Sequence, residues 1–165
     1  MSALEDLFES LRPPVVGGDT RFAVVPIGVG LRHLIAKDQT GYPAILIDAP
    51  PKGATLLRIE LQHLTVHPDL RCEVEFPEGT ATTGSYTLIR CTGDGDLQAL
   101  FLRLMSGLIA ELGPQRDRSD LARTVLRLVD LFRALDAPPK RSIQGLWAEL
   151  FLIAQARDPI RILEA

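Results

Sequence analysis

Cysteine and histidine, the side chains that most often hold metal ions, are scarce in this sequence of 165 residues. There are two cysteines, Cys72 and Cys91, and three histidines. Neither cysteine has a CxxC partner or a nearby histidine at ligand spacing, so we expect no metal site around them. Both lie at strand-like positions. This predicts buried free thiols in a reducing cytoplasm, with a disulfide between the two as the alternative.

Long apolar runs and dense clusters of basic residues are also absent. No apolar stretch of about 18 residues could span a membrane, and Met1–Asp6 lacks the basic and apolar regions of a signal peptide. Residues 1–114 hold nine Lys or Arg against fourteen Asp or Glu, whereas residues 115–165 hold nine against seven. The mildly basic final third predicts solvated helix faces, with phosphate contact as the alternative. We therefore expect a cytoplasmic protein without a membrane partner.

Complete catalytic motifs are missing as well. No serine or cysteine stands in a glycine-flanked nucleophile elbow. Gly28–Gly30 lacks the third glycine of a dinucleotide loop and precedes a strand, which favours a turn. Gly93–Asp96 lacks the terminal glutamate of a calcium loop and suits a strand-to-helix turn. His63 and His67 share a strand face at ~13 Å, too far apart to hold one zinc ion.

What the sequence does contain is a change of hydrophobic period along the chain. Residues 1–18 predict a helix and a linker, because Pro13-Pro14 and Gly17-Gly18 end the helical spacing. Residues 19–93 predict an antiparallel β-rich module, because short strand patterns alternate with turn residues. The expected strands are Phe22–Pro26, Leu31–Ala36, Ala44–Ile47, Leu56–Leu61, Leu64–His67, Leu70–Phe76 and Ser85–Cys91.

Residues 94–165 predict three to four helices, so the fold class is α+β. Asp94 or Asp96 is expected to cap the first of these helices, which Gly113-Pro114 ends. A second helix starts near Asp117 or Ser119 and stops at Ala137-Pro138-Pro139-Lys140. Ser142 is expected to cap a third, and Asp158-Pro159 ends it and begins a fourth.

The third helix is strongly apolar and contains one acid, Glu149. Its expected buried face is formed by Ile143, Leu146, Trp147, Leu150, Phe151 and Ala154. Burial of a lone carboxylate is costly, so Glu149 should reach water, an arginine or a metal ion. An ordinary structural role at the edge of the apolar stripe, paired with Arg141 or Arg157 or solvated, is the simplest interpretation of the spacing.

The segment Arg141–Ile153, with Gly145-Leu146-Trp147-Ala148-Glu149-Leu150 at its centre, resembles the GLxGEL segment of a bacterial PD-(D/E)XK family, the DUF4420 group. Ala148 stands where that family usually has glycine. The order of a β-rich region, a helix with Phe101 and Leu104 and an arginine-containing helix is also similar. The resemblance implies a nuclease of restriction-like, phage-defence loci, in which Asp and Glu carboxylates hold Mg²⁺ and a lysine assists the attacking water.

By that resemblance, Glu149 has a supporting catalytic and metal-binding role, and residues 94–165 lead toward a nuclease core. The Asp and the Glu-x-Lys of the family have no counterpart before Ala165. One glutamate cannot provide the oxygen ligands of Mg²⁺, so we expect this chain alone to bind no cofactor and to be inactive. DNA binding is expected only for a longer parent protein.

We therefore predict the N-terminal, non-catalytic part of an endonuclease-like protein. The alternative is a non-enzymatic adaptor that binds a partner protein, or a second copy of itself, through its apolar C-terminal helices. A third hypothesis is a small-ligand-binding β domain with a helical lid.

Overall fold

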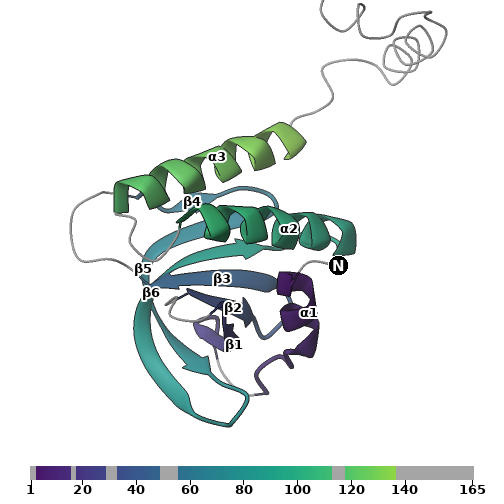
Figure 1. The fold of residues 1–165 in the computed structure, drawn as a ribbon, viewed down its shortest axis with the longest axis vertical. Helices are drawn as coiled ribbons and strands as arrows, with labels where there is room; N and C mark the ends of the chain where they lie inside the picture. The colour runs from purple at the N-terminus through teal and green to yellow at the C-terminus, as the bar shows by residue number, and fades with distance from the viewer. Residues whose placement is uncertain (1–2, 16–17, 29–32, 49–55, 113–117, 137–165) are drawn as a thin grey trace, which may run out of the picture.

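The computed structural model describes residues 3–15, 18–28, 33–48, 56–112 and 118–136; for residues 111–112 and 118–120 it describes the backbone alone. Their fold is α+β, as the hydrophobic pattern predicts, and Figure 1 shows the helices beside a strongly coiled sheet. The elements in chain order are α1 (Ala3–Ser10), β1 (Arg21–Pro26), β2 (His33–Lys37), β3 (Pro43–Asp48), β4 (Ile59–Glu60), β5 (Leu64–Glu75), β6 (Ala81–Cys91), α2 (Gly95–Leu112) and α3 (Arg118–Asp136).

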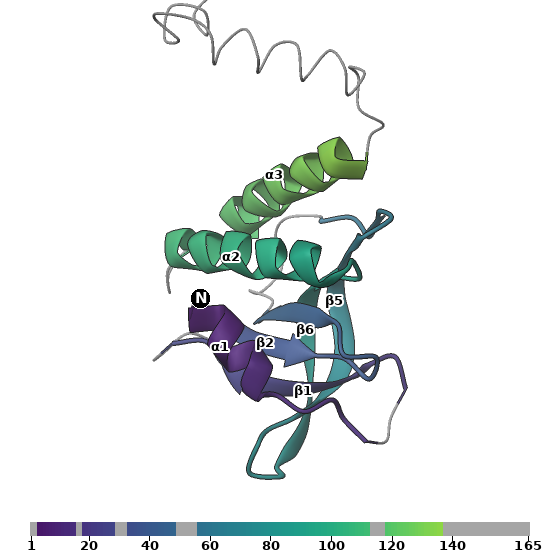
Figure 2. The same ribbon diagram turned by 90° about the vertical axis from the view of Figure 1, so that its right-hand side faces the viewer.

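The sheet closes into a small barrel. Its strand order is β1-β2-β3-β6-β5-β4. An additional pairing of β1 with β5 closes β1, β2, β3, β6 and β5 into a ring of five strands, and β4 extends the sheet beyond β5. Neighbours are antiparallel except β1 and β5, which are parallel over three residue pairs. An odd number of strands in the ring makes one parallel junction unavoidable. Figure 2 shows α2 and α3 above this barrel and the β5–β6 hairpin extending below it.

The barrel has two apolar faces because side chains alternate along each strand. The outer face packs against all three described helices and includes Ile35, Ile45, Val66 and Ile89. The inner face is closed by strand residues alone, which are Phe22, Val24, Leu34, Ala36, Ala44, Leu46, Cys72, Val74 and Leu88. The barrel is therefore a packed core and the helices cover its outside.

The expected break between strands at Pro68-Asp69 is wrong, because β5 runs through it as a β-bulge. Across the break, His67 pairs with Leu88 and Leu70 with Tyr86, so two residues oppose the single Thr87. Pro68 has no N–H to offer the ladder, and Asp69 takes a φ of 51°, a left-handed conformation that aspartate tolerates. The extra residue reverses the alternation of β5. Val66 consequently faces the helices, whereas Cys72 and Val74 face the barrel interior.

Cys72 and Cys91 are both buried free thiols, as predicted, and the alternative of a disulfide is wrong. They belong to opposite apolar faces of the sheet, Cys72 to the inner one and Cys91 to the outer one. Burial raises the pKa of both thiols, that of Cys72 to about 11. Such thiols are poor nucleophiles near neutral pH.

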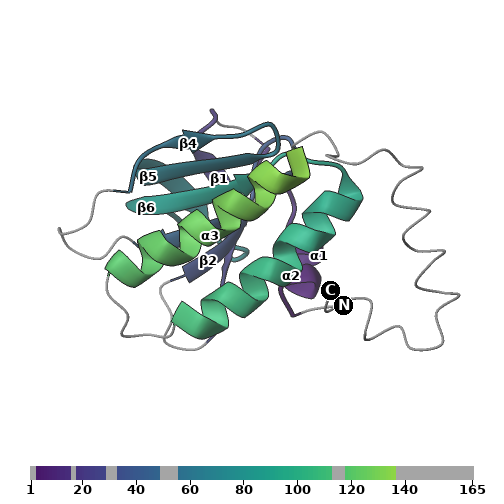
Figure 3. The same cartoon turned by 90° about the horizontal axis from the view of Figure 1, so that it is seen from above.

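The two long helices lie side by side over the barrel (Figure 3). Phe101 of α2 and Phe132 of α3 are fully buried and meet edge to face, with ring centroids 6.4 Å apart. The short α1 is tied to α2 by an ion pair, since Arg103 Nε lies 3.0 Å from Glu5 Oε1. Among the residues that the structure describes, no helix combines the length and apolar character needed to cross a membrane.

Candidate functional site

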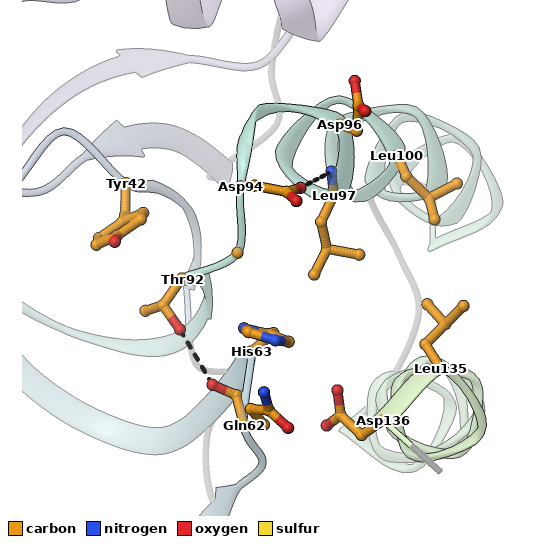
Figure 4. A pocket seen from close by; sticks show the side chains of 11 residues that line it. Tyr42, Gln62, His63, Thr92, Asp94, Asp96, Leu97, Leu100, Leu135 and Asp136 are labelled. Carbon is orange, nitrogen blue, oxygen red and sulfur yellow. Dashed lines mark hydrogen bonds between the residues drawn. The ribbon is translucent and has the colours of Figure 1, made fainter. Parts of the chain in front are cut away.

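A cleft of about 740 Å³ opens at one end of the barrel, where α2 begins and α3 ends (Figure 4). Three connecting segments and both long helices contribute to its wall. The lining residues are Tyr42, Gln62, His63, Thr92, Gly93, Asp94, Asp96, Leu97, Leu100, Leu135 and Asp136. Segments from positions 42 to 136 of the chain thus converge on one cavity with both polar and apolar walls.

Tyr42 is held in this wall by the buried carboxylate of Asp38. Asp38 Oδ1 accepts hydrogen bonds from the backbone N–H of Thr40 at 2.9 Å and of Tyr42 at 2.8 Å, and from the Thr40 hydroxyl at 2.7 Å. Gly41 takes a φ of +91°, which closes the turn. Arg90 approaches the other carboxylate oxygen, with Nη1 3.5 Å from Oδ2. Asp38 is therefore a structural acid that organises the β2–β3 loop.

His63 lines the cleft, whereas His67 does not. The backbone N–H of Thr92 donates to the His63 carbonyl at 3.0 Å, which ties the turn before β5 to the end of β6. His67 Nδ1 lies 3.1 Å from the Pro68 carbonyl oxygen. The two histidines therefore have separate surroundings.

Asp94 is the N-cap of α2, which decides between the two expected capping residues. Its Oδ1 accepts a hydrogen bond from the Leu97 N–H at 3.0 Å, and its carbonyl accepts the first helical bond from Gln98 at 2.9 Å. Gln98 Nε2 donates back to the Gly93 carbonyl at 2.8 Å. The segment Gly93–Asp96 is a strand-to-helix turn, as the sequence predicts.

The cleft is acidic, because Asp94, Asp96 and Asp136 line it, and no lysine or arginine is found among the lining residues that the structure describes. One Asp94 oxygen already serves as the helix cap. In the described part of the chain, no three His, Cys, Asp or Glu side chains are grouped so as to hold a metal ion. The cleft has the size of a ligand pocket.

A second hollow of about 350 Å³, which we call the helix groove, lies between α2 and α3. Its lining is mostly aliphatic, with an arginine on each helix. The residues are Arg103, Leu104, Gly107 and Leu108 of α2, and Arg127, Leu128 and Leu131 of α3. A sequence pattern of leucines does not separate this surface from the core, because both lie on one broad apolar stripe of each helix.

Glu149, the candidate catalytic and metal-binding residue, lies outside the described residues, as do the expected third and fourth helices of the 94–165 region. The structure therefore does not place that residue relative to the cleft or the helix groove. Comparisons with models of known protein families, with curated proteins and with solved structures find no match to this chain.

Proposed function

We propose that this chain is the N-terminal, non-catalytic part of a PD-(D/E)XK endonuclease-like protein of a bacterial restriction or phage-defence system. The support is the Arg141–Ile153 segment, together with the order of a β-rich module followed by helices. One observation carries the proposal. Helix α3 ends at Asp136, beside the cleft and shortly before that segment. The barrel and the α2–α3 layer would then serve as the platform on which the nuclease helix is mounted.

The magnesium ion of the family does not fit the residues that the structure describes. These residues contain no group of three potential ligands, and Asp94 in the cleft already caps α2. Mg²⁺ requires near-octahedral oxygen ligation, which the resemblance assigns to Glu149 together with carboxylates further along a parent protein. No hydrolytic step is therefore derived for this module.

Within this proposal the module works in the cytoplasm and contacts a protein. The acidic first two thirds of the chain disfavour DNA as the direct ligand, because phosphate contacts require lysine or arginine. DNA binding is assigned to the rest of the parent protein.

Two measurements test the proposal. The gene sequence beyond codon 165 should encode, in frame, an Asp and a Glu-x-Lys; without them the nuclease assignment fails. Plasmid cleavage with Mg²⁺ or Mn²⁺ should be no greater for this chain than for its Glu149→Ala variant. Robust cleavage that Glu149→Ala abolishes would instead show that the chain itself is the enzyme.

A second candidate function is a non-enzymatic adaptor, favoured by the apolar surface of the helix pair. Leu131 and Leu135 of α3 remain 39% and 50% exposed, and Leu100 of α2 remains 38% exposed. These leucines lie around the helix groove and the adjoining cleft, where a partner helix could bind. In that case the surface should be open in the isolated chain and covered in the complex.

A further inference from the structure

Leucines line both sides of the α2–α3 seam. Leu100, Leu131 and Leu135 are exposed, Leu104 and Leu108 are half-buried, and Leu128 is buried. On α2, Leu100, Leu104 and Leu108 recur every four residues and therefore share one side of the helix. On α3, Leu128, Leu131 and Leu135 do the same at intervals of three and four. The two rows meet at the helix groove at one end and at the cleft at the other. We call the apolar surface formed by these two rows the channel.

On the α2 side of this channel, Gly107 has no side chain to project from the helix surface. A Cβ atom placed on Gly107 would meet no other atom within 4 Å, and the residue is exposed. A glycine in mid-helix weakens the helix by about 1 kcal/mol relative to alanine. Its smooth surface permits a close helix–helix approach at this point.

The rim of the channel is positive near Gly107. Arg127 of α3 and Arg103 of α2 both line the helix groove and are exposed. Arg103 already forms an ion pair with the buried Glu5. Arg127 is therefore the arginine better placed to receive an acid from a helix in the channel.

We propose that the channel is the docking site of this chain's own segment 142–154. That segment is predicted from its sequence to be an apolar helix, and Leu135 and Asp136, at the end of α3, line the cleft at one end of the channel. Residues 137–141 can span at most about 17 Å, whereas packed helix axes lie about 8–10 Å apart. A connection of this length is ordinary between antiparallel helices. The chain thus supplies an occupant of matching character within reach.

The charge pattern fits the same arrangement. In a helix antiparallel to α3 that starts beside Leu135, Glu149 lies about 10 Å beyond Ser142. Arg127 lies about 12 Å from Leu135 along α3 by the same rise per residue. Glu149 therefore comes level with Arg127, which gives the lone acid of an apolar helix a partner. The assignment concerns packing within this chain and does not depend on the nuclease proposal.

Trp147 is the single tryptophan of the chain and lies within the proposed occupant, so it reports on docking directly. We expect blue-shifted emission and weak quenching by acrylamide in the intact chain, at all protein concentrations. Leu131→Gln, in the channel, should lower the docked-to-undocked ratio by roughly five- to tenfold and so increase the quenching. Leu126→Gln is the matched control, because Leu126 is 47% exposed and nine residues, or two and a half turns, from Leu135.

The ion pair is tested by exchanging its charges. Arg127→Glu and Glu149→Arg should each lower the docked-to-undocked ratio by roughly two- to fivefold, and the double variant should restore it. Circular dichroism confirms that each variant retains its fold.

Three outcomes would overturn the proposal. Acrylamide could quench Trp147 as strongly in the native chain as in Leu131→Gln, or Leu126→Gln could increase the quenching as much as Leu131→Gln does. In the third outcome, Trp147 is shielded from acrylamide only as the protein concentration rises. The last of these would assign the channel to a second copy. If acrylamide reaches Trp147 freely at every protein concentration, a partner protein is favoured as the occupant of the channel. If the nuclease motif proves absent from the gene while Trp147 behaves as expected, the docking proposal stands and the nuclease proposal fails.

Discussion

Replacing Phe132 with alanine should be among the most destabilising single changes in α3. Phe132 is fully buried, and its ring meets that of Phe101 edge to face with the planes at 81°. Truncating a buried phenylalanine costs about 3–5 kcal/mol, because apolar transfer energy is lost and a cavity remains. For a chain of this length, a cost of that size lowers the melting temperature by about 6–20 °C.

Urea denaturation followed by far-UV circular dichroism measures this cost. Leu126→Ala is the control, since Leu126 lies on the same helix with 47% of its side chain exposed and should change stability by less than about 0.5 kcal/mol. A double-mutant cycle with Phe101→Leu and Phe132→Leu should give a coupling of about 0.5–1.5 kcal/mol, the usual value of such an aromatic pair. A cost below about 1 kcal/mol for Phe132→Ala would refute the packing of α3 against α2, and with it the helix groove.

Three further predictions follow from the start of α2 and the barrel interior. Asp94→Ala should destabilise the protein by about 0.5–2 kcal/mol, because the Leu97 N–H loses its capping partner. Asp96→Ala, the control, should cost less than about 1 kcal/mol. Equal costs for the two variants would contradict the assignment of Asp94 as the cap. Gly93→Ala should cost about 1–3 kcal/mol in chemical denaturation, because the new Cβ would lie 2.8 Å from Leu97 Cβ, and an unchanged unfolding midpoint would refute that contact. Burial raises the pKa of Cys72 from 9.0 to about 11, so above pH 9 the unfolded chain loses this proton while the folded one keeps it. The free energy of unfolding should therefore fall between pH 9 and 11 by roughly 2 kcal/mol at most, and Cys72→Ala should flatten that dependence; an identical pH profile for both proteins would exclude Cys72 as its source.

The sequence predicts the α+β class and most strand positions because both depend on local pattern. Turn residues such as Gly41 and Gly79 have the positive φ values that turns require, and Asp94 has the side chain that a helix start requires. The closure of the barrel is different. The parallel pairing of Arg21, Phe22 and Ala23 with Glu73, Val74 and Glu75 joins segments about fifty residues apart, and no local period encodes it. The cleft likewise depends on contacts between distant segments, since its lining residues come from the β2–β3 loop, the turn before β5, the end of β6 and the two long helices.

Local sequence signals also mislead where the same residue types suit two structures, such as a turn and a β-bulge. Pro68-Asp69 has the composition of a turn, and a turn would end one strand and begin another. In the barrel the same two residues form a bulge, because the partner strand continues unbroken from Ala81 to Cys91 and pairs on both sides of it. Had β5 been regular, Leu64, Val66, Cys72 and Val74 would all face one side of the sheet. The bulge instead divides them between the outer core, under the helices, and the inner core of the barrel. A single strand can thus take part in both cores, and this allows so short a chain to close a barrel and still support a helical layer over it.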